Sequence, residues 1–193
     1  MRASRAIRKM LLLPLLILAA CTPEQEALPP RVTEPRAFEG NAPRGAPLLR
    51  RAMLTLHNAA RASVRAPELA WDEGLARDAQ AYARDLAQRS VFEHSRQPRG
   101  NPPQGENLWM GTRGAYRYDE MAQHWIDEQR FFINNAIPNV SRSGRFEDVG
   151  HYTQIIWRST TRVGCGFASN RRDDYLVCRY TPAGNLLGQR AVP

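Results

Sequence analysis

The feature that most constrains this fold is a pair of cysteines placed symmetrically about a short polar turn near the C-terminus. Two segments rich in β-branched and aromatic residues, VGCGFAS and YLVCRY, are typical of strands, and five polar residues separate them. In a hairpin centred between residues 171 and 172, paired residue numbers sum to 343, and Cys165 and Cys178 meet this condition. Direct pairing brings their Cα atoms to a separation compatible with a disulfide, which would add about 3 kcal/mol of stability. Two free buried thiols are the alternative.

The first 21 residues have the pattern of an export signal. A cationic start, MRASRAIRK, precedes an apolar run from Met10 to Leu18 that is too short to span a bilayer. The sequence then reads Leu-Ala-Ala-Cys, which resembles the lipobox of bacterial lipoproteins, where the cysteine thiol is acylated. We therefore predict a lipoprotein signal peptide over residues 1–20 and a lipid anchor on Cys21, in the bacterial cell envelope outside the cytoplasm. Thr22 resembles the residue typical of outer-membrane sorting if the cell is Gram-negative. A cleaved exported protein with an incidental cysteine is the alternative.

The next segment is rich in proline, with six prolines between residues 22 and 47. Such a composition favours a semi-extended, disordered linker, so we predict a linker over residues 21–46 and one domain over residues 47–193. The whole chain carries 27 basic and 19 acidic residues, a net charge of +8. Removal of residues 1–20 takes away four bases and no acids, which leaves about +4. The arginines are also dispersed, so we expect no nucleic-acid partner.

Apolar residues at helical spacing predict three helices in this domain. The first runs from Leu49 to Val64 and ends before Pro67, the second is capped by Asp72, and the third spans about residues 119–132. The segment HYTQIIWRS is rich in β-branched and aromatic residues and predicts a further strand. Helices followed by antiparallel strands indicate the α+β class, with the helices packed on the sheet.

Glu128 is the most informative polar residue. On the third predicted helix it falls within 20° of Met121, close to Trp125, on the face that should be buried. Glutamate is rarely buried without a partner or a metal, so it either belongs to a buried pair or lines a cleft. His124 lies one turn earlier, at a spacing that two ligands of one metal can have, although such pairs are common by chance.

Three other residues sit where functional side chains are often found. His94 follows the second helix, Glu106 ends a Gly/Pro-rich loop, and His151 follows Gly150 at the start of the predicted strand HYTQIIWRS. Strand alternation would place His151 on the same face as Thr153. No two of these residues are close enough in sequence for spacing alone to indicate a metal site.

Several motifs resemble one known family. GHYTQIIWRST and YLVCRYTPAGNL resemble the two signature motifs of the CAP superfamily, which comprises the cysteine-rich secretory proteins, antigen 5 and the plant pathogenesis-related class 1 proteins. Four upstream motifs also match, at His57, Asn58 and Arg61; Leu69, Trp71, Asp72, Leu75 and Ala79; Phe92, His94 and Ser95; and Gly105 to Leu108. The resemblance covers roughly residues 48–188, and six motifs in order are highly specific.

The resemblance implies a fold and a site. The fold is a three-layer α-β-α sandwich of CAP type with a small antiparallel sheet. The site is a shallow cleft lined by His94, Glu106, Glu128 and His151, which in some members binds zinc or another divalent metal, a donor set that suits such ions. The counterpart of His57 is structural in the family, so we expect His57 to be hydrogen-bonded within the fold.

Three functions are compatible with these observations. We favour a binding domain whose cleft takes a divalent metal and an unknown small-molecule, lipid or peptide ligand. A metal-assisted hydrolase of peptidase or esterase type would use the same cleft, with a glutamate as general base. A lipid or sterol carrier is the third possibility. A serine-type enzyme would need His94 to activate the adjacent Ser95, but neighbouring residues of an extended chain point apart.

Overall fold

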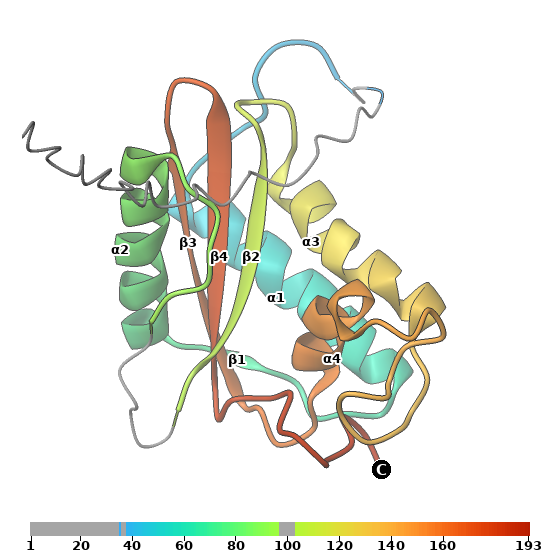
Figure 1. Ribbon diagram of the computed structural model, residues 1–193. Coiled ribbons are helices and arrows are strands. Elements are labelled where there is room, and N and C mark those ends of the chain that lie inside the picture. Colours follow the sequence, from blue (N-terminus) through green and yellow to red (C-terminus); the bar gives the residue numbers. More distant parts are fainter. Residues whose placement is uncertain (1–34, 36–37, 97–102) are drawn as a thin grey trace, which may run out of the picture.

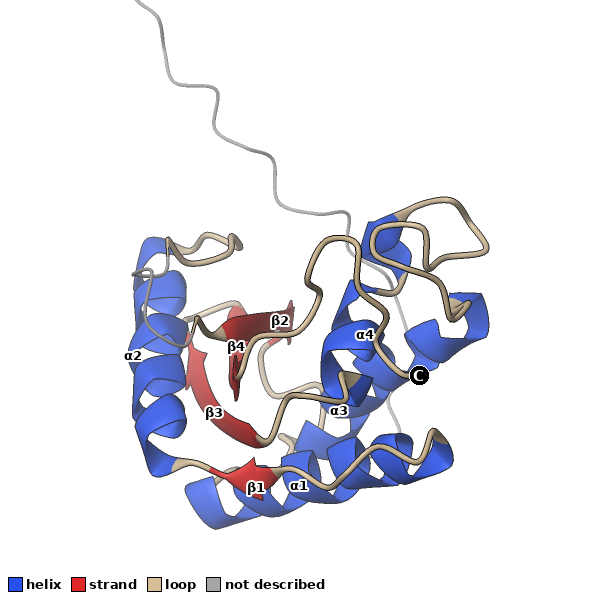
Figure 2. Ribbon diagram, turned by 90° about the horizontal axis from the view of Figure 1, so that it is seen from below, coloured by secondary structure: helices blue, strands red, loops and turns tan. Residues whose placement is uncertain are grey.

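The computed structural model describes residue 35 and residues 38–96 and 103–193. The predicted signal peptide, Cys21 and most of the predicted linker lie outside the described residues. The described chain forms three layers, in which a sheet lies between α2 on one face and α1, α3 and α4 on the other (Figures 1 and 2). The predicted α+β class and three-layer sandwich are therefore confirmed. In the described part of the chain, no helix combines the length and the apolar character needed to cross a bilayer.

The sheet has four strands, in the order β1-β3-β4-β2. They are β1 (Ala70–Trp71), β2 (Gly105–Thr112), β3 (Arg162–Ser169) and β4 (Asp173–Thr181). β2, β4 and β3 pair antiparallel, whereas the short β1 runs parallel to β3. The sheet is thus mixed, although an antiparallel one was predicted, because the chain before α2 adds a short strand beside β3 instead of forming a loop.

The C-terminal hairpin has the predicted register. β3 and β4 place Cys165 opposite Cys178, and the two residues form a disulfide with a Cα–Cα distance of 4.1 Å. β4 is the buried strand at the centre of the fold, and its alternate residues face opposite layers. Tyr175 and Val177 pack toward α2, and Cys178 packs with the core on the other face.

The helices are α1 (Ala46–Ser63), α2 (Glu73–Arg89), α3 (Tyr118–Asp127) and α4 (Gly150–Ile156). α1 ends before Pro67, and Asp72 caps α2 by accepting hydrogen bonds from Gly74 and Leu75, both as predicted. α2 lies directly on β3 because two strand positions lack a side chain. A Cβ at Gly164 would overlap the backbone nitrogen of Ala76, and one at Gly166 would overlap the backbone of Gln80.

The segment HYTQIIWRS is not a strand. It forms the seven-residue helix α4 and the turn after it, so the predicted strand and its facing of His151 with Thr153 are wrong. Two tertiary contacts explain the difference. The carboxylate of Glu128 accepts hydrogen bonds from the first backbone amides of α4. At the other end, the buried guanidinium of Arg61 donates to the carbonyls of Ile155, Trp157 and Thr160.

The third predicted helix is shorter than expected. α3 ends at Asp127, and residues 128–131 continue as a 3₁₀ turn. The predicted apolar face is nevertheless the buried one, since Met121 and Trp125 belong to the main core. Glu128 starts the 3₁₀ turn, where its side chain reaches the beginning of α4.

Candidate functional site

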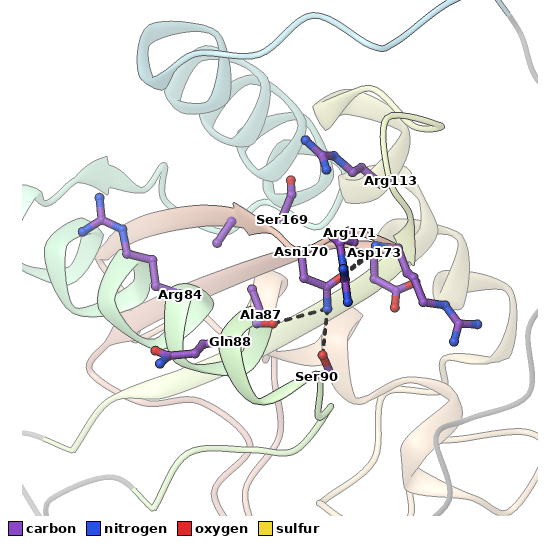
Figure 3. Close-up of a pocket in the computed structure, with 11 residues that line it drawn as sticks. Arg84, Ala87, Gln88, Ser90, Arg113, Ser169, Asn170, Arg171 and Asp173 are labelled. Atoms are coloured by element: carbon purple, nitrogen blue, oxygen red, sulfur yellow. Dashed lines mark hydrogen bonds between the residues drawn. The ribbon is translucent and has the colours of Figure 1, made fainter.

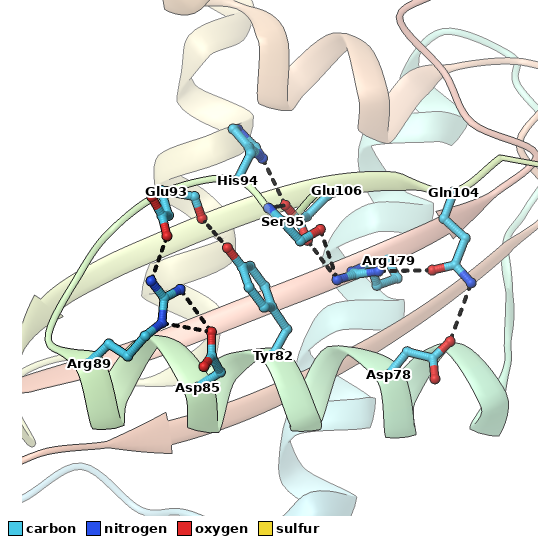
Figure 4. A network of polar contacts seen from close by, with 10 residues as sticks. All are labelled: Asp78, Tyr82, Asp85, Arg89, Glu93, His94, Ser95, Gln104, Glu106 and Arg179. Carbon is cyan, nitrogen blue, oxygen red and sulfur yellow. Dashed lines mark hydrogen bonds and ion pairs between the residues drawn. The ribbon is translucent and has the colours of Figure 1, made fainter. Parts of the chain in front are cut away.

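The first part of the site is a contact between His94 and Glu106, which lie on either side of the loop between α2 and β2 (Figure 4). Nδ1 of His94 is 2.9 Å from Oε1 of Glu106. The same carboxylate accepts hydrogen bonds from the backbone amide and the hydroxyl of Ser95, at 2.9 and 2.8 Å. The Glu106 side chain is only 3% exposed, whereas that of His94 is 65% exposed. The pair therefore has a fixed acid and an accessible imidazole.

Arg179 supplies the charge that lets Glu106 stay buried. The two residues are direct partners in the β2–β4 register, and a guanidinium nitrogen of Arg179 lies 2.9 Å from Oε2 of Glu106. Burial raises the pKa of Glu106, but the hydrogen bonds from His94 and Ser95 and the charge of Arg179 outweigh it and hold the pKa below its usual value. Glu106 is thus held as an anion.

The second part of the site is a contact between Glu128 and His151. Nδ1 of His151 is 2.6 Å from Oε1 of Glu128, and Oε2 accepts the backbone amides of His151 and Tyr152 at 3.0 and 3.1 Å. The His151 ring also stacks on the Trp125 ring, with 5.8 Å between centroids and 18° between planes. Carboxylate, amides and indole together fix the orientation of this imidazole, which is 30% exposed.

Strand β2 connects the two pairs. It is the strand at one edge of the sheet, and its successive side chains point to opposite faces. Glu106 turns to the α2 face, where Arg179 lies over Tyr82, while the next residue, Asn107, donates from Nδ2 to the carbonyl of His151 at 3.1 Å. The two pairs therefore flank one edge strand, each held to it by one of two consecutive residues.

Both histidines are held through the same nitrogen. With Nδ1 of His94 and of His151 hydrogen-bonded to a carboxylate, Nε2 is the ring nitrogen left for a ligand. This is how metal-binding histidines are usually arranged, because a carboxylate on one nitrogen fixes the ring and makes the other nitrogen a better ligand. Within the described ranges, no three His, Cys, Asp or Glu side chains lie together closely enough to hold a metal by themselves.

The other two histidines are engaged elsewhere. His57 is fully buried, and its Nε2 lies 2.8 Å from the hydroxyl of Tyr180, so the expected structural hydrogen bond is present. Burial lowers the pKa of His57 to about 4. His124 does not pair with Glu128, because its Nδ1 accepts a hydrogen bond from the indole of Trp109 at 2.9 Å and its ring stacks on that indole.

Two residues that hold the site together, Arg179 and Asn107, were not predicted from the sequence. Arg179 could have been noticed by the test that singled out Glu128, since it lies in an apolar strand on the same side as Tyr175 and Val177. Asn107 carried no such signal, because β2 itself was not predicted and the direction of its side chain depends on that strand.

Comparisons with known proteins agree with this architecture. Residues 54–180 match the model of the cysteine-rich secretory protein family, CAP. Pathogenesis-related protein PR-1 of Medicago truncatula is 37% identical over 135 residues, which are 69% of this chain and 73% of the relative. Pathogenesis-related protein 1B of Nicotiana tabacum is 36% identical over 137 residues, 70% of this chain and 76% of the relative.

A similar structure has been solved with a metal. The crystal structure of NaASP2 with Zn²⁺ superposes with a TM-score of 0.60 at 26% identity, and the match covers 79% of this chain and 90% of that one. The match to the family model, the identity to plant relatives and the shared fold all point to the same assignment. The chain belongs to the cysteine-rich secretory protein family, that is, to the CAP superfamily.

Proposed function

We propose that this protein is an envelope-anchored CAP domain that binds a divalent metal, such as zinc, between its two histidine–glutamate pairs. His94 and His151 would hold the metal through Nε2, and Glu106 and Glu128 would hold the two rings in place. The observation that carries the proposal is that each imidazole is held by a carboxylate at Nδ1, which leaves the same nitrogen on both rings for a ligand. The solved structure of a similar protein with Zn²⁺ supports it.

A metal held by two protein nitrogens has coordination positions left for water or for donor atoms of a bound molecule. A small-molecule or peptide ligand with a carboxylate or another oxygen donor would bind there, so we propose capture of such a ligand as the role of the cleft. The bound metal would supply Lewis acidity, while the protein residues orient the two rings and keep the Glu106 carboxylate ionised.

The arrangement around Ser95 favours binding over serine-type catalysis. Its hydroxyl donates to Glu106 at 2.8 Å and accepts from Arg179 at 3.1 Å. A serine nucleophile needs its proton taken by a base such as imidazole, but Nδ1 of His94 is bonded to the same carboxylate as the hydroxyl. Metal-assisted hydrolysis of a peptide or ester by the same cleft is the alternative function.

Anchoring rests on the lipobox-like Leu-Ala-Ala-Cys and on the proline-rich segment after it. Acylation of Cys21 would hold the domain on the envelope surface, on the outer membrane if the cell is Gram-negative, with the linker as a spacer. A Cys21→Ser variant should leave the membrane fraction, and its full retention there would contradict the anchor.

Zinc titration by calorimetry tests the metal site. We expect one zinc ion per chain in the parent protein and no measurable heat of binding in the His94→Ala, His151→Ala double variant. His124→Ala is the matched control, because it removes a histidine that is bonded to Trp109 and lies outside the two pairs. Equal zinc binding by the double variant and the parent, or loss of binding in the His124 variant alone, would overturn the proposal.

A further inference from the structure

A pocket lies away from the two histidine–glutamate pairs, where the β3–β4 turn meets the C-terminal end of α2 (Figure 3). Its volume is about 750 Å³. Four arginines line it: Arg84 from α2, Arg113 just after β2, and Arg171 and Arg172 from the turn. We call it the arginine pocket. Asp173 is the one acidic residue in its lining, and it is buried beneath the turn, so the pocket is strongly positive among the described residues.

Several other arginines of this domain are paired with acidic side chains. Arg44 pairs with Asp174, Arg89 with Asp85 and Glu93, and Arg179 with Glu106. The guanidinium groups of the arginine pocket form no ion pair or side-chain hydrogen bond with any described residue. Their charges are therefore available to a ligand.

The backbone that carries these arginines is firmly held. The side-chain amide of Asn170 donates to the carbonyl of Ala87 at 3.3 Å and to the hydroxyl of Ser90 at 3.1 Å, which ties the turn to the end of α2 (Figure 3). Its oxygen accepts the backbone amides of Arg172 and Asp173, each at 2.8 Å. The amide of Arg113 donates to the carbonyl of Arg172 at 2.9 Å. Three chain segments thus present their arginines on one fixed frame.

The β3–β4 turn lies at the same end of the domain as the described residues that precede α1 (Figure 1). The amide of Ala42 donates to the carbonyl of Gly114, next to Arg113, at 2.9 Å. Two residues later, Arg44 pairs with Asp174 at 2.6 Å, directly after the turn. The described residues that precede α1 therefore lie beside the arginine pocket.

We propose that the arginine pocket binds a phosphate-bearing anion, either a phospholipid headgroup or a free phosphate ester. Guanidinium groups suit phosphate because their planar donors match two phosphate oxygens at once and keep their charge at every physiological pH. This site is separate from the proposed metal site, and neither depends on the other.

The test compares two double variants that remove the same charge. Arg171→Gln with Arg172→Gln alters the pocket, whereas Arg65→Gln with Arg142→Gln alters two exposed arginines outside its lining. Both are made in residues 21–193 with Cys21→Ser, so that no acyl group contributes. All four side chains are exposed, and circular dichroism should be the same for the two variants.

The probes are vesicles of phosphatidylglycerol with phosphatidylcholine, measured by co-sedimentation, and glycerol 3-phosphate, measured by NMR shifts. Each arginine near an anionic membrane adds roughly fivefold in affinity, so the pocket variant should bind vesicles about 25-fold more weakly, and the control variant less than about threefold. Selective loss of vesicle binding identifies a lipid headgroup, and selective loss of glycerol 3-phosphate binding alone identifies a soluble ester. No binding of either probe by the parent, or equal losses in the two variants, would overturn the proposal.

Discussion

The two histidine–glutamate pairs contain the same residue types but are stabilised differently. Glu106 is buried and receives a full opposite charge from Arg179, whereas Glu128 is 18% exposed and accepts two backbone amides at the start of α4. For the imidazoles it is the second pair that has the more enclosed side chain. His94 is mostly exposed, and His151 is stacked on Trp125. One pair is thus fixed through its acid and the other through its imidazole, so substitutions should affect them unequally.

The largest effect should come from removing the charge that compensates Glu106. Arg179→Met leaves a carboxylate buried without its cation, and loss of one partner of a buried ion pair costs about 3–5 kcal/mol. We expect the free energy of unfolding at pH 7 to fall by about that amount in urea denaturation. Among the described residues no arginine pairs with Glu128, so the second pair should keep its structure.

The double variant Arg179→Met, Glu106→Gln tests the cause of this loss. With no charge left in the buried position, it should recover more than half of the lost stability. If it is as unstable as Arg179→Met alone, the contribution of Arg179 is packing and not compensation of Glu106.

To compare how the two pairs affect stability as the pH changes, the contribution of His57 to the pH dependence of the free energy of unfolding must first be removed. Burial lowers the pKa of His57 from 6.5 to about 4, so the unfolded chain binds a proton before the folded one does. Its stabilising contribution is complete above pH 6.5 and is lost as the pH falls to about 4, roughly 3 kcal/mol in all. His57→Gln should therefore lower stability at pH 7 but flatten its decline between these pH values, as measured by urea denaturation. An unchanged slope would assign the decline to other groups.

The smallest expected effect separates the roles of the two glutamates in metal binding. Glu106→Gln and Glu128→Gln should each weaken zinc binding by about 10–100-fold, because the carboxylate on Nδ1 fixes the ring and raises the basicity of Nε2. Only Glu106→Gln should also lower the free energy of unfolding, since it leaves the buried guanidinium of Arg179 without its counter-ion.

Glu93→Gln is the matched control, because Glu93 is next to His94 in sequence but pairs with Arg89. Calorimetry should show its zinc affinity unchanged. If the variants of Glu106 and Glu128 also bind zinc as tightly as the parent, the carboxylates do not support the metal site.

Much of the fold could be predicted from local patterns. The cysteine pair about a polar turn gave the correct register of β3 and β4, and Asp72 marked the start of α2, because both features depend on residues close in sequence. The helical phase of α3 also placed Glu128 on the inward side. β2 was not predicted. Neither was α4, because it is too short to be stable by itself and is held at its ends by Glu128 and Arg61.

By itself, the sequence determined the α+β class and the hairpin with its disulfide. Through the family resemblance it also implied the three-layer sandwich and the grouping of His94, Glu106, Glu128 and His151. Only the tertiary structure decided how these four residues pair. Glu106 finds its partner in Arg179, 73 positions away, and Glu128 finds His151, 23 positions away, through packing of separate elements about one edge strand. The reason is physical: a charged side chain is held by the groups that surround it in space, and long-range packing, which no local pattern encodes, brings those groups together.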